Sequence, residues 1–254
     1  MPEKIHKLKW MRKVGQSVAN ILKRLKEEIR PDISGKHLEK LAIELMKKEE
    51  VCSSSLGYKD SFPSAICVSV NSELTHGIPN EKKFQEGDLV SFDVACYVKN
   101  EKGITYHADA ALTIIVGEGD EKKKNLLSVT KNSLHYVIQK IIPNKTTVQD
   151  IGEMLEKYIR TRGYHPIKEY GGHGIGEKLH QEPFIPNYKI PNKGGIIKSG
   201  MFICIEPLVQ INDAKIEISK DKWTVVSKNN HLNAHFEHTI YINDEEAEII
   251  TNFE

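Results

Sequence analysis

Residues 88–98, DLVSFDVACYV, and residues 104–116, ITYHADAALTIIV, have the composition of two apolar strands joined by a short polar connector. Each strand carries one carboxylate inside its apolar run, Asp93 in the first and Asp109 in the second. We predict a β-hairpin centred near Glu101, which places Asp93 directly opposite Asp109. Like charges directly opposite each other destabilise a sheet, and a buried carboxylate without a partner is costly. Since neither strand contains a Lys or Arg, the pattern predicts a metal ion between the two aspartates.

Two further lone acids interrupt apolar strands later in the chain. Glu206 lies in FICIEPLV and Glu237 in AHFEHTIYI. Taken singly, each is compatible with an edge residue or a surface salt bridge, but four such acids together favour a metal site. His173, in GGHGIGEKLHQEP, has glycines on both sides that leave an imidazole unobstructed. Four carboxylates and one imidazole favour Mn, Fe or Co, and their charge calls for two ions about 3.5–4 Å apart.

The composition is that of an ordinary soluble globular protein. The chain has 254 residues, 39% hydrophobic and 28% charged, with a net charge of +1, which gives no electrostatic argument for a nucleic-acid or membrane partner. Its four cysteines form no CxxC pair, which favours free thiols in a reducing compartment. The N-terminal MPEKIHKLKW lacks the apolar core of a secretory signal. No apolar run approaches the roughly 18 residues of a membrane span, so we expect a cytoplasmic protein.

The expected helices and strands follow the same order twice. Helical spacing predicts two helix pairs, 5–29 and a helix capped by Ser34 in the first half, and 120–142 and 148–162 in the second. Strand-like runs follow each pair, those of the second half at 201–211, 223–226, 236–242 and 248–251. We predict a single α+β domain, 1–254, made of two pseudo-repeats, about 1–118 and 119–254. The alternative is a chance recurrence of common helix–hairpin signals.

Five local motifs carry a family resemblance. They are THGIP, VSFDVACY, YGGHGIGEKLHQEPFIPNY, FICIEP and AHFEHT. With the hairpin they supply, in order, His76, Asp93, Asp109, His173, His180, Glu206 and Glu237. This order resembles the type I methionine aminopeptidases, and the resemblance spans essentially the whole chain. It implies the pita-bread fold, in which two pseudo-symmetric halves form a central curved antiparallel sheet covered by two helix pairs.

The resemblance also implies residue roles. The ligands of two divalent ions (Co, Mn, Fe or Zn) would be Asp93, Asp109, His173, Glu206 and Glu237. Glu206 would also be the general base for a water or hydroxide bridging the ions, and His76 and His180 would flank the scissile amide. The walls of an apolar pocket for a methionine side chain would be Tyr58, Phe62, Cys67, His76, Leu179, His180 and Trp223.

The implied activity is removal of the N-terminal methionine from nascent proteins whose second residue is small, by a monomer in transient contact with the ribosome. One alternative is an X-Pro aminopeptidase, although such enzymes usually carry an additional N-terminal domain. Another is a non-catalytic pita-bread binding protein, although such proteins typically lose metal ligands. The chain departs from the usual family pattern near the site, which bears on pocket shape and metal affinity, at Ser55, Ala108, Ala110, Ala111 and Leu179.

Overall fold

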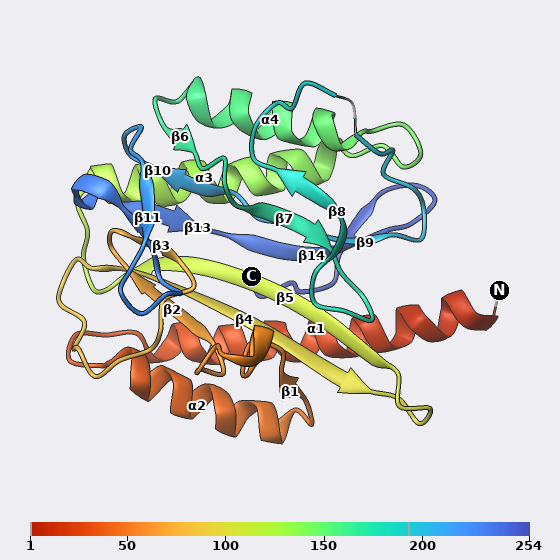
Figure 1. Ribbon diagram of the computed structural model, residues 1–254, viewed down its shortest axis with the longest axis horizontal. Helices are drawn as coiled ribbons and strands as arrows, with labels where there is room; N and C mark the ends of the chain where they lie inside the picture. The colour runs from red at the N-terminus through yellow and green to blue at the C-terminus, as the bar shows by residue number, and fades with distance from the viewer. Residues whose placement is uncertain (1, 193) are drawn as a thin grey trace.

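A computed structural model describes residues 2–192 and 194–254 and shows one large curved sheet between two helix pairs (Figure 1). The helices are α1 (Pro2–Glu28), α2 (Gly35–Lys48), α3 (Glu121–Lys140) and α4 (Val148–Arg160). The first pair lies on the side of the early strands, and the second pair on the side of the later strands. The pita-bread architecture predicted from the sequence is therefore confirmed. None of the helices described is both long and apolar enough to cross a membrane.

The large sheet has nine strands in the order β1-β4-β5-β14-β9-β7-β8, with β2 paired to β4 and β15 paired to β14. These strands are β1 (Cys52–Ser53), β2 (Cys67–Val70), β4 (Leu89–Lys99), β5 (Thr105–Ile115), β7 (Gly171–Gly174), β8 (Gln181–Pro186), β9 (Phe202–Ile205), β14 (Glu237–Ile242) and β15 (Ala247–Ile249). Two small sheets flank it, each of three strands. They contain β6 (His165–Pro166), β10 (Leu208–Gln210) and β13 (Asn233–His235), and β3 (Glu73–Thr75), β11 (Ile216–Ile218) and β12 (Val225–Ser227).

Helices α2, α3 and α4 begin where the sequence predicts, because polar side chains satisfy their first N–H groups. Asp120 accepts the N–H of Lys123 at the start of α3. Ser34 accepts the N–H of His37 at the start of α2. Thr147 and Asp150 form a reciprocal capping box at the start of α4. Such caps contribute about 1 kcal/mol each. Short 3₁₀ turns at Tyr58–Asp60 and Lys228–Asn230 complete the regular structure.

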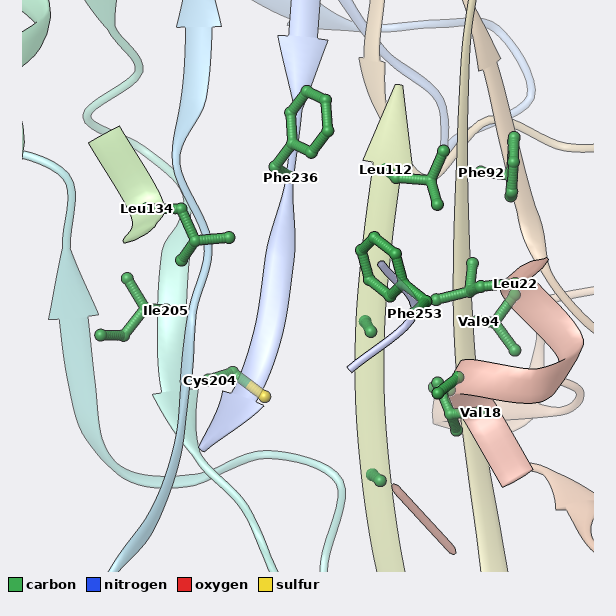
Figure 2. Close-up of a cluster of buried hydrophobic side chains, with 14 of the residues drawn as sticks. Val18, Leu22, Phe92, Val94, Leu112, Leu134, Cys204, Ile205, Phe236 and Phe253 are labelled. Carbon is green, nitrogen blue, oxygen red and sulfur yellow. The ribbon is translucent and has the colours of Figure 1, made fainter. Parts of the chain in front are cut away.

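The core lies between the sheet and the helices and joins both halves of the chain. The apolar face of α1 places Val18 and Leu22 against the early strands, where Val94 also points (Figure 2). On the other side, Leu134 of α3 and Ile205 of β9 are part of the same cluster. All five side chains are almost completely buried, and each contributes roughly 1.5–3 kcal/mol of hydrophobic stabilisation.

The central hairpin differs from the prediction by one position in its centre. Lys99 pairs with Thr105, so β4 and β5 turn about Lys102, where the side chain of Asn100 accepts the N–H groups of Lys102 and Ile104. Asp93 consequently pairs with Ala111, and Asp109 pairs with Ala95. The prediction that the aspartates lie directly opposite each other is wrong. They are diagonal neighbours on one face, which is still within side-chain reach.

The predicted strand 201–211 is also wrong, because it breaks at Glu206 and Pro207. β9 ends at Ile205, and β10 begins at Leu208 in a different sheet. Proline has no N–H to donate to a ladder, which favours a break at this point. The predicted strand 223–226 begins later than expected, at Val225, because the carboxylate of Asp221 accepts the N–H groups of the two residues before it.

Threonine hydroxyls extend the junction between β5 and β14, which joins the two halves of the sheet. Only two Cα pairs connect these strands, centred on Ala111 and Glu237. On one side of them, Thr239 Oγ1 accepts the N–H of Asp109 and donates to its carbonyl, at 2.9 and 2.7 Å. On the other side, Thr113 Oγ1 makes the same pair of bonds to His235, at 2.8 and 2.9 Å. The strands therefore open around the acidic residues while their backbone groups stay satisfied.

Candidate active site

The five predicted metal ligands come together on one face of the large sheet. Ligand atoms of Asp93, Asp109 and Glu237, from three adjacent strands, all lie within 4.8 Å of one another. His173 on β7 places Nε2 3.9 Å from Glu237 Oε1. Glu206, at the break after β9, lines the same cavity. Residues from both halves of the chain thus form one acidic cluster.

Burial without a compensating positive charge dominates the electrostatics of this cluster. It raises the pKa of Asp93, Asp109 and Glu237 well above the ordinary values, and the neighbouring carboxylates raise these pKa values further. Burial also opposes ionisation of Glu206, but contact with His235 leaves the pKa of Glu206 lowered. Asp109 Oδ1 and Glu237 Oε1 are buried without a hydrogen-bond partner among the described residues. Oxygens in this state fit a site for cations.

His173 is oriented as a metal ligand would be. Its Nδ1 lies 3.0 Å from the carbonyl oxygen of Gly174, and donation to that oxygen leaves Nε2 facing the cluster. Burial lowers the pKa of His173, which favours the neutral imidazole that metals bind. The adjacent Gly172 allows β7 to approach its neighbour closely, because a Cβ there would lie 2.0 Å from the carbonyl oxygen of Cys204.

His76 and His180 lie at the same cavity, as predicted. The ring centroids of His173 and His180 are 4.3 Å apart, and the ring of His76 meets that of Tyr170 at 5.5 Å. Burial lowers the pKa of His76, and it lowers the pKa of His180 to about 4. Both imidazoles are therefore neutral at neutral pH and can donate an N–H. His76 has a φ of 57°, a left-handed conformation that is rare outside glycine and is found at functional sites.

An apolar pocket adjoins the acidic cluster within a cavity of about 590 Å³. All the predicted wall residues line it: Tyr58, Phe62, Cys67, His76, Leu179, His180 and Trp223. The ring of Phe62 meets the ring of Trp223 edge-on at 5.1 Å, and the ring of Tyr58 meets that of His180 at 5.1 Å. Aromatic and sulfur-bearing walls suit an unbranched thioether side chain.

Several residues at the site were absent from the sequence prediction. The cavity is also lined by Lys59, Glu169, Tyr170, Glu182 and Phe184. His235, which is 1% exposed, places Nε2 2.9 Å from Glu206 Oε1. The signal for His235 was present in AHFEHT, because residues two apart in an extended segment point to the same face, here His235 and Glu237. The other five lining residues have no comparable signal in the sequence.

Comparison with known proteins places the chain in a family. The model of metallopeptidase family M24 matches residues 9–244. This chain belongs to metallopeptidase family M24. It is 39% identical to a methionine aminopeptidase from Mycoplasma capricolum, over 99% of this chain and 97% of that protein. The crystal structure of methionine aminopeptidase from Thermotoga maritima superposes with a TM-score of 0.92 at 38% identity, covering 97% of both chains.

The resemblance to methionine aminopeptidases predicted from the sequence is thus confirmed over nearly the full length of this M24 chain. A more distant structure, the prolidase from Pyrococcus furiosus, shares the fold at a TM-score of 0.75 and 20% identity. The match covers 98% of this chain but only 64% of the prolidase. Sequence identity therefore favours the methionine aminopeptidases over the prolidases.

Proposed function

We propose that this chain is a methionine aminopeptidase that hydrolyses the bond after an N-terminal methionine with the help of two divalent ions. The observation that carries the proposal is the acidic cluster beside an apolar, sulfur-compatible pocket, in a chain that matches methionine aminopeptidases over almost its whole length. The substrates are nascent proteins, and a small second residue is preferred because the acidic cluster limits the space beyond the scissile bond.

We assign the ion ligands to Asp93, Asp109, His173, Glu206 and Glu237. Two observations support this assignment. Among the described residues, Asp109 Oδ1 and Glu237 Oε1 are buried without a hydrogen-bond partner, and Nε2 of His173 faces Glu237. When bound, two divalent ions supply Lewis acidity and a nucleophilic water at neutral pH. The donor set suits Mn, Fe, Co or Zn.

The other roles follow from the chemistry of the remaining side chains. Glu206 is the general base, since its carboxylate keeps a lowered pKa among buried acids. His76 and His180 are neutral donors that orient the scissile amide and stabilise the oxyanion. Phe62 and Trp223 enclose the methionine side chain. The acidic cluster receives the free α-amine of the substrate, which explains cleavage at an N-terminus.

The site also supports proposals about where and how the enzyme works. Nascent chains are made in the cytoplasm, so we place the enzyme there, as a monomer in transient contact with the ribosome. The domain is proposed to consist of two pseudo-repeats, about 1–118 and 119–254. The two-helix-then-strand order of each half supports this division, as do the threonine bridges that join β5 to β14 and β5 to β13.

The test is to incubate the Mn²⁺-loaded or Co²⁺-loaded protein with Met-Ala-Ser and with Ala-Pro peptides and to analyse the products by mass spectrometry. Release of methionine from Met-Ala-Ser is expected. Cleavage of the Ala-Pro peptide alone would assign the chain to the X-Pro enzymes, and no cleavage with either metal would favour a binding protein. Glu206→Ala is expected to abolish turnover, and retained turnover would remove Glu206 from the role of general base.

A further inference from the structure

His235 is a buried imidazole in direct contact with the acidic cluster, to which the proposed reaction assigns no role. It is 1% exposed and is the last residue of β13, separated from the start of β14 by Phe236. Its Nε2 lies 2.9 Å from Glu206 Oε1 and 3.9 Å from Glu237 Oε2. It therefore faces two of the proposed ion ligands at once.

The backbone of His235 is fixed from both sides. Its pairing partner on β10 is Leu208, which follows the interruption between β9 and β10 where Glu206 lies. Thr113 Oγ1 accepts the N–H of His235 and donates to its carbonyl, and Thr113 in turn contacts the hydroxyl of Ser91 at 2.8 Å. Because Thr113 and Ser91 lie on β5 and β4, this hydroxyl chain ties His235 to the strands that carry the two aspartates.

The side chain of His235 has one close partner. Although Nε2 is 2.9 Å from Glu206 Oε1, the direction of its N–H misses that oxygen, so Nε2 makes no fully formed hydrogen bond within the described residues. A buried N–H without a hydrogen bond is destabilising. A rotation of the Glu206 carboxylate would complete the bond and would leave its second oxygen available to accept a proton from water.

We propose that His235 is a positioning residue, which donates Nε2–H to one oxygen of Glu206 and thereby fixes the orientation of the general base. Partners behind a metal ligand typically change metal affinity or activity by about 10–100-fold when they are removed. The competing role is direct coordination, because Glu206, His235 and Glu237 also bring ligand atoms within 4.8 Å of one another. The proposal rests on the ion site described above.

Two substitutions by amide residues test whether the position of the N–H donor matters. In His235→Gln, the amide nitrogen lies about as far from the backbone as Nε2 of the imidazole, whereas in His235→Asn it falls one bond short. Each variant is compared with the wild-type protein by the kcat and KM for Met-Ala-Ser, by calorimetric titration of the metal-free protein with Mn²⁺, and by the visible absorption of the Co²⁺ form. His37→Asn is the control, since His37 is exposed on α2, outside this cavity and outside the groups of side chains that could hold a metal ion.

For H235N we expect kcat to fall by about 10–100-fold with little change in KM, and Mn²⁺ binding to weaken by a similar factor. H235Q is expected to recover both quantities to within a few-fold, and H37N to match the wild type. The Co²⁺ absorption bands should stay in place in both variants. Should H235N fail to fold, H235A takes its place.

Three results overturn the proposal. Wild-type kcat and Mn²⁺ affinity in H235N would show that the contact with Glu206 has no functional effect. A defect in H235Q as large as that in H235N would show that an N–H donor at the position of Nε2 does not explain the effect of His235. A changed Co²⁺ spectrum in both variants would make His235 a ligand. A wild-type protein that neither binds Mn²⁺ nor releases methionine would instead refute the proposed function.

Discussion

Thr239→Val tests how the two halves of the sheet hold Asp109 in place. Thr239 is fully buried, and its hydroxyl is the partner of both the N–H and the carbonyl of Asp109. Valine has nearly the same shape but no hydroxyl, so both backbone groups lose their partner. Because Asp109 also contributes to the acidic cluster, its displacement should reduce Mn²⁺ affinity as well as stability.

The magnitude follows from the two lost hydrogen bonds. Each buried group left without a partner costs about 1–3 kcal/mol, and the added methyl group returns about 0.8 kcal/mol. We therefore expect a decrease of about 1–5 kcal/mol in the free energy of unfolding. In a chain of this size, that decrease lowers the Tm by roughly 2–20 °C.

The assay is urea unfolding of the metal-free protein, monitored by tryptophan fluorescence. Thr239→Ser is the matched control, since it keeps the hydroxyl and loses only a methyl group, at a cost of about 1 kcal/mol. If T239V proved as stable as T239S, the Thr239 hydroxyl would not stabilise the junction between β5 and β14.

Three further predictions concern the pH dependence, the backbone and the pocket. In the metal-free protein, burial raises the pKa of three cluster carboxylates, so stability should fall as the pH rises from about 4 through these raised pKa values. Mn²⁺ needs the ionised carboxylates, so the gain in Tm on adding Mn²⁺ should grow between pH 5.5 and 8, and a constant gain would contradict the cluster as the binding site. Gly172→Ala should prevent soluble expression or weaken Mn²⁺ binding severely, because its Cβ would lie 2.0 Å from a carbonyl oxygen of β9; a wild-type thermal melt and Mn²⁺ titration would contradict the packing described. Trp223→Ala, which removes one wall of the pocket, should raise the KM for Met-Ala-Ser about tenfold, since a lost apolar contact costs roughly 1–3 kcal/mol, and an unchanged KM would exclude Trp223 from substrate binding.

Local signals predicted most of the fold and the candidate ligands. Helix caps such as Ser34 and Thr147 act through neighbouring residues, so their motifs are visible in the sequence. The lone carboxylates were visible because an acid inside an apolar strand contradicts the surrounding pattern. Because Asp93 and Asp109 are both acids inside apolar strands of one hairpin, the sequence predicts that they share a site even though it does not give their exact register.

The errors arose where the outcome depended on longer-range geometry. The hairpin centre was set by the side chain of Asn100 capping its own turn, and a shift of one position changed which residues faced Asp93 and Asp109. The break at Pro207 moved one predicted strand into two sheets. His235 was missed although it lies two positions before Glu237 in AHFEHT, because the sequence does not show that its Nε2 lies against the distant Glu206.

Anomalous diffraction from crystals grown with Mn²⁺ tests directly whether the acidic cluster binds two divalent ions. We expect two anomalous peaks about 3.5–4 Å apart. Both peaks should lie within coordination distance of the five proposed ligands, Asp93, Asp109, His173, Glu206 and Glu237. Peaks elsewhere on the molecule, or no peak among these five side chains at saturating Mn²⁺, would contradict it.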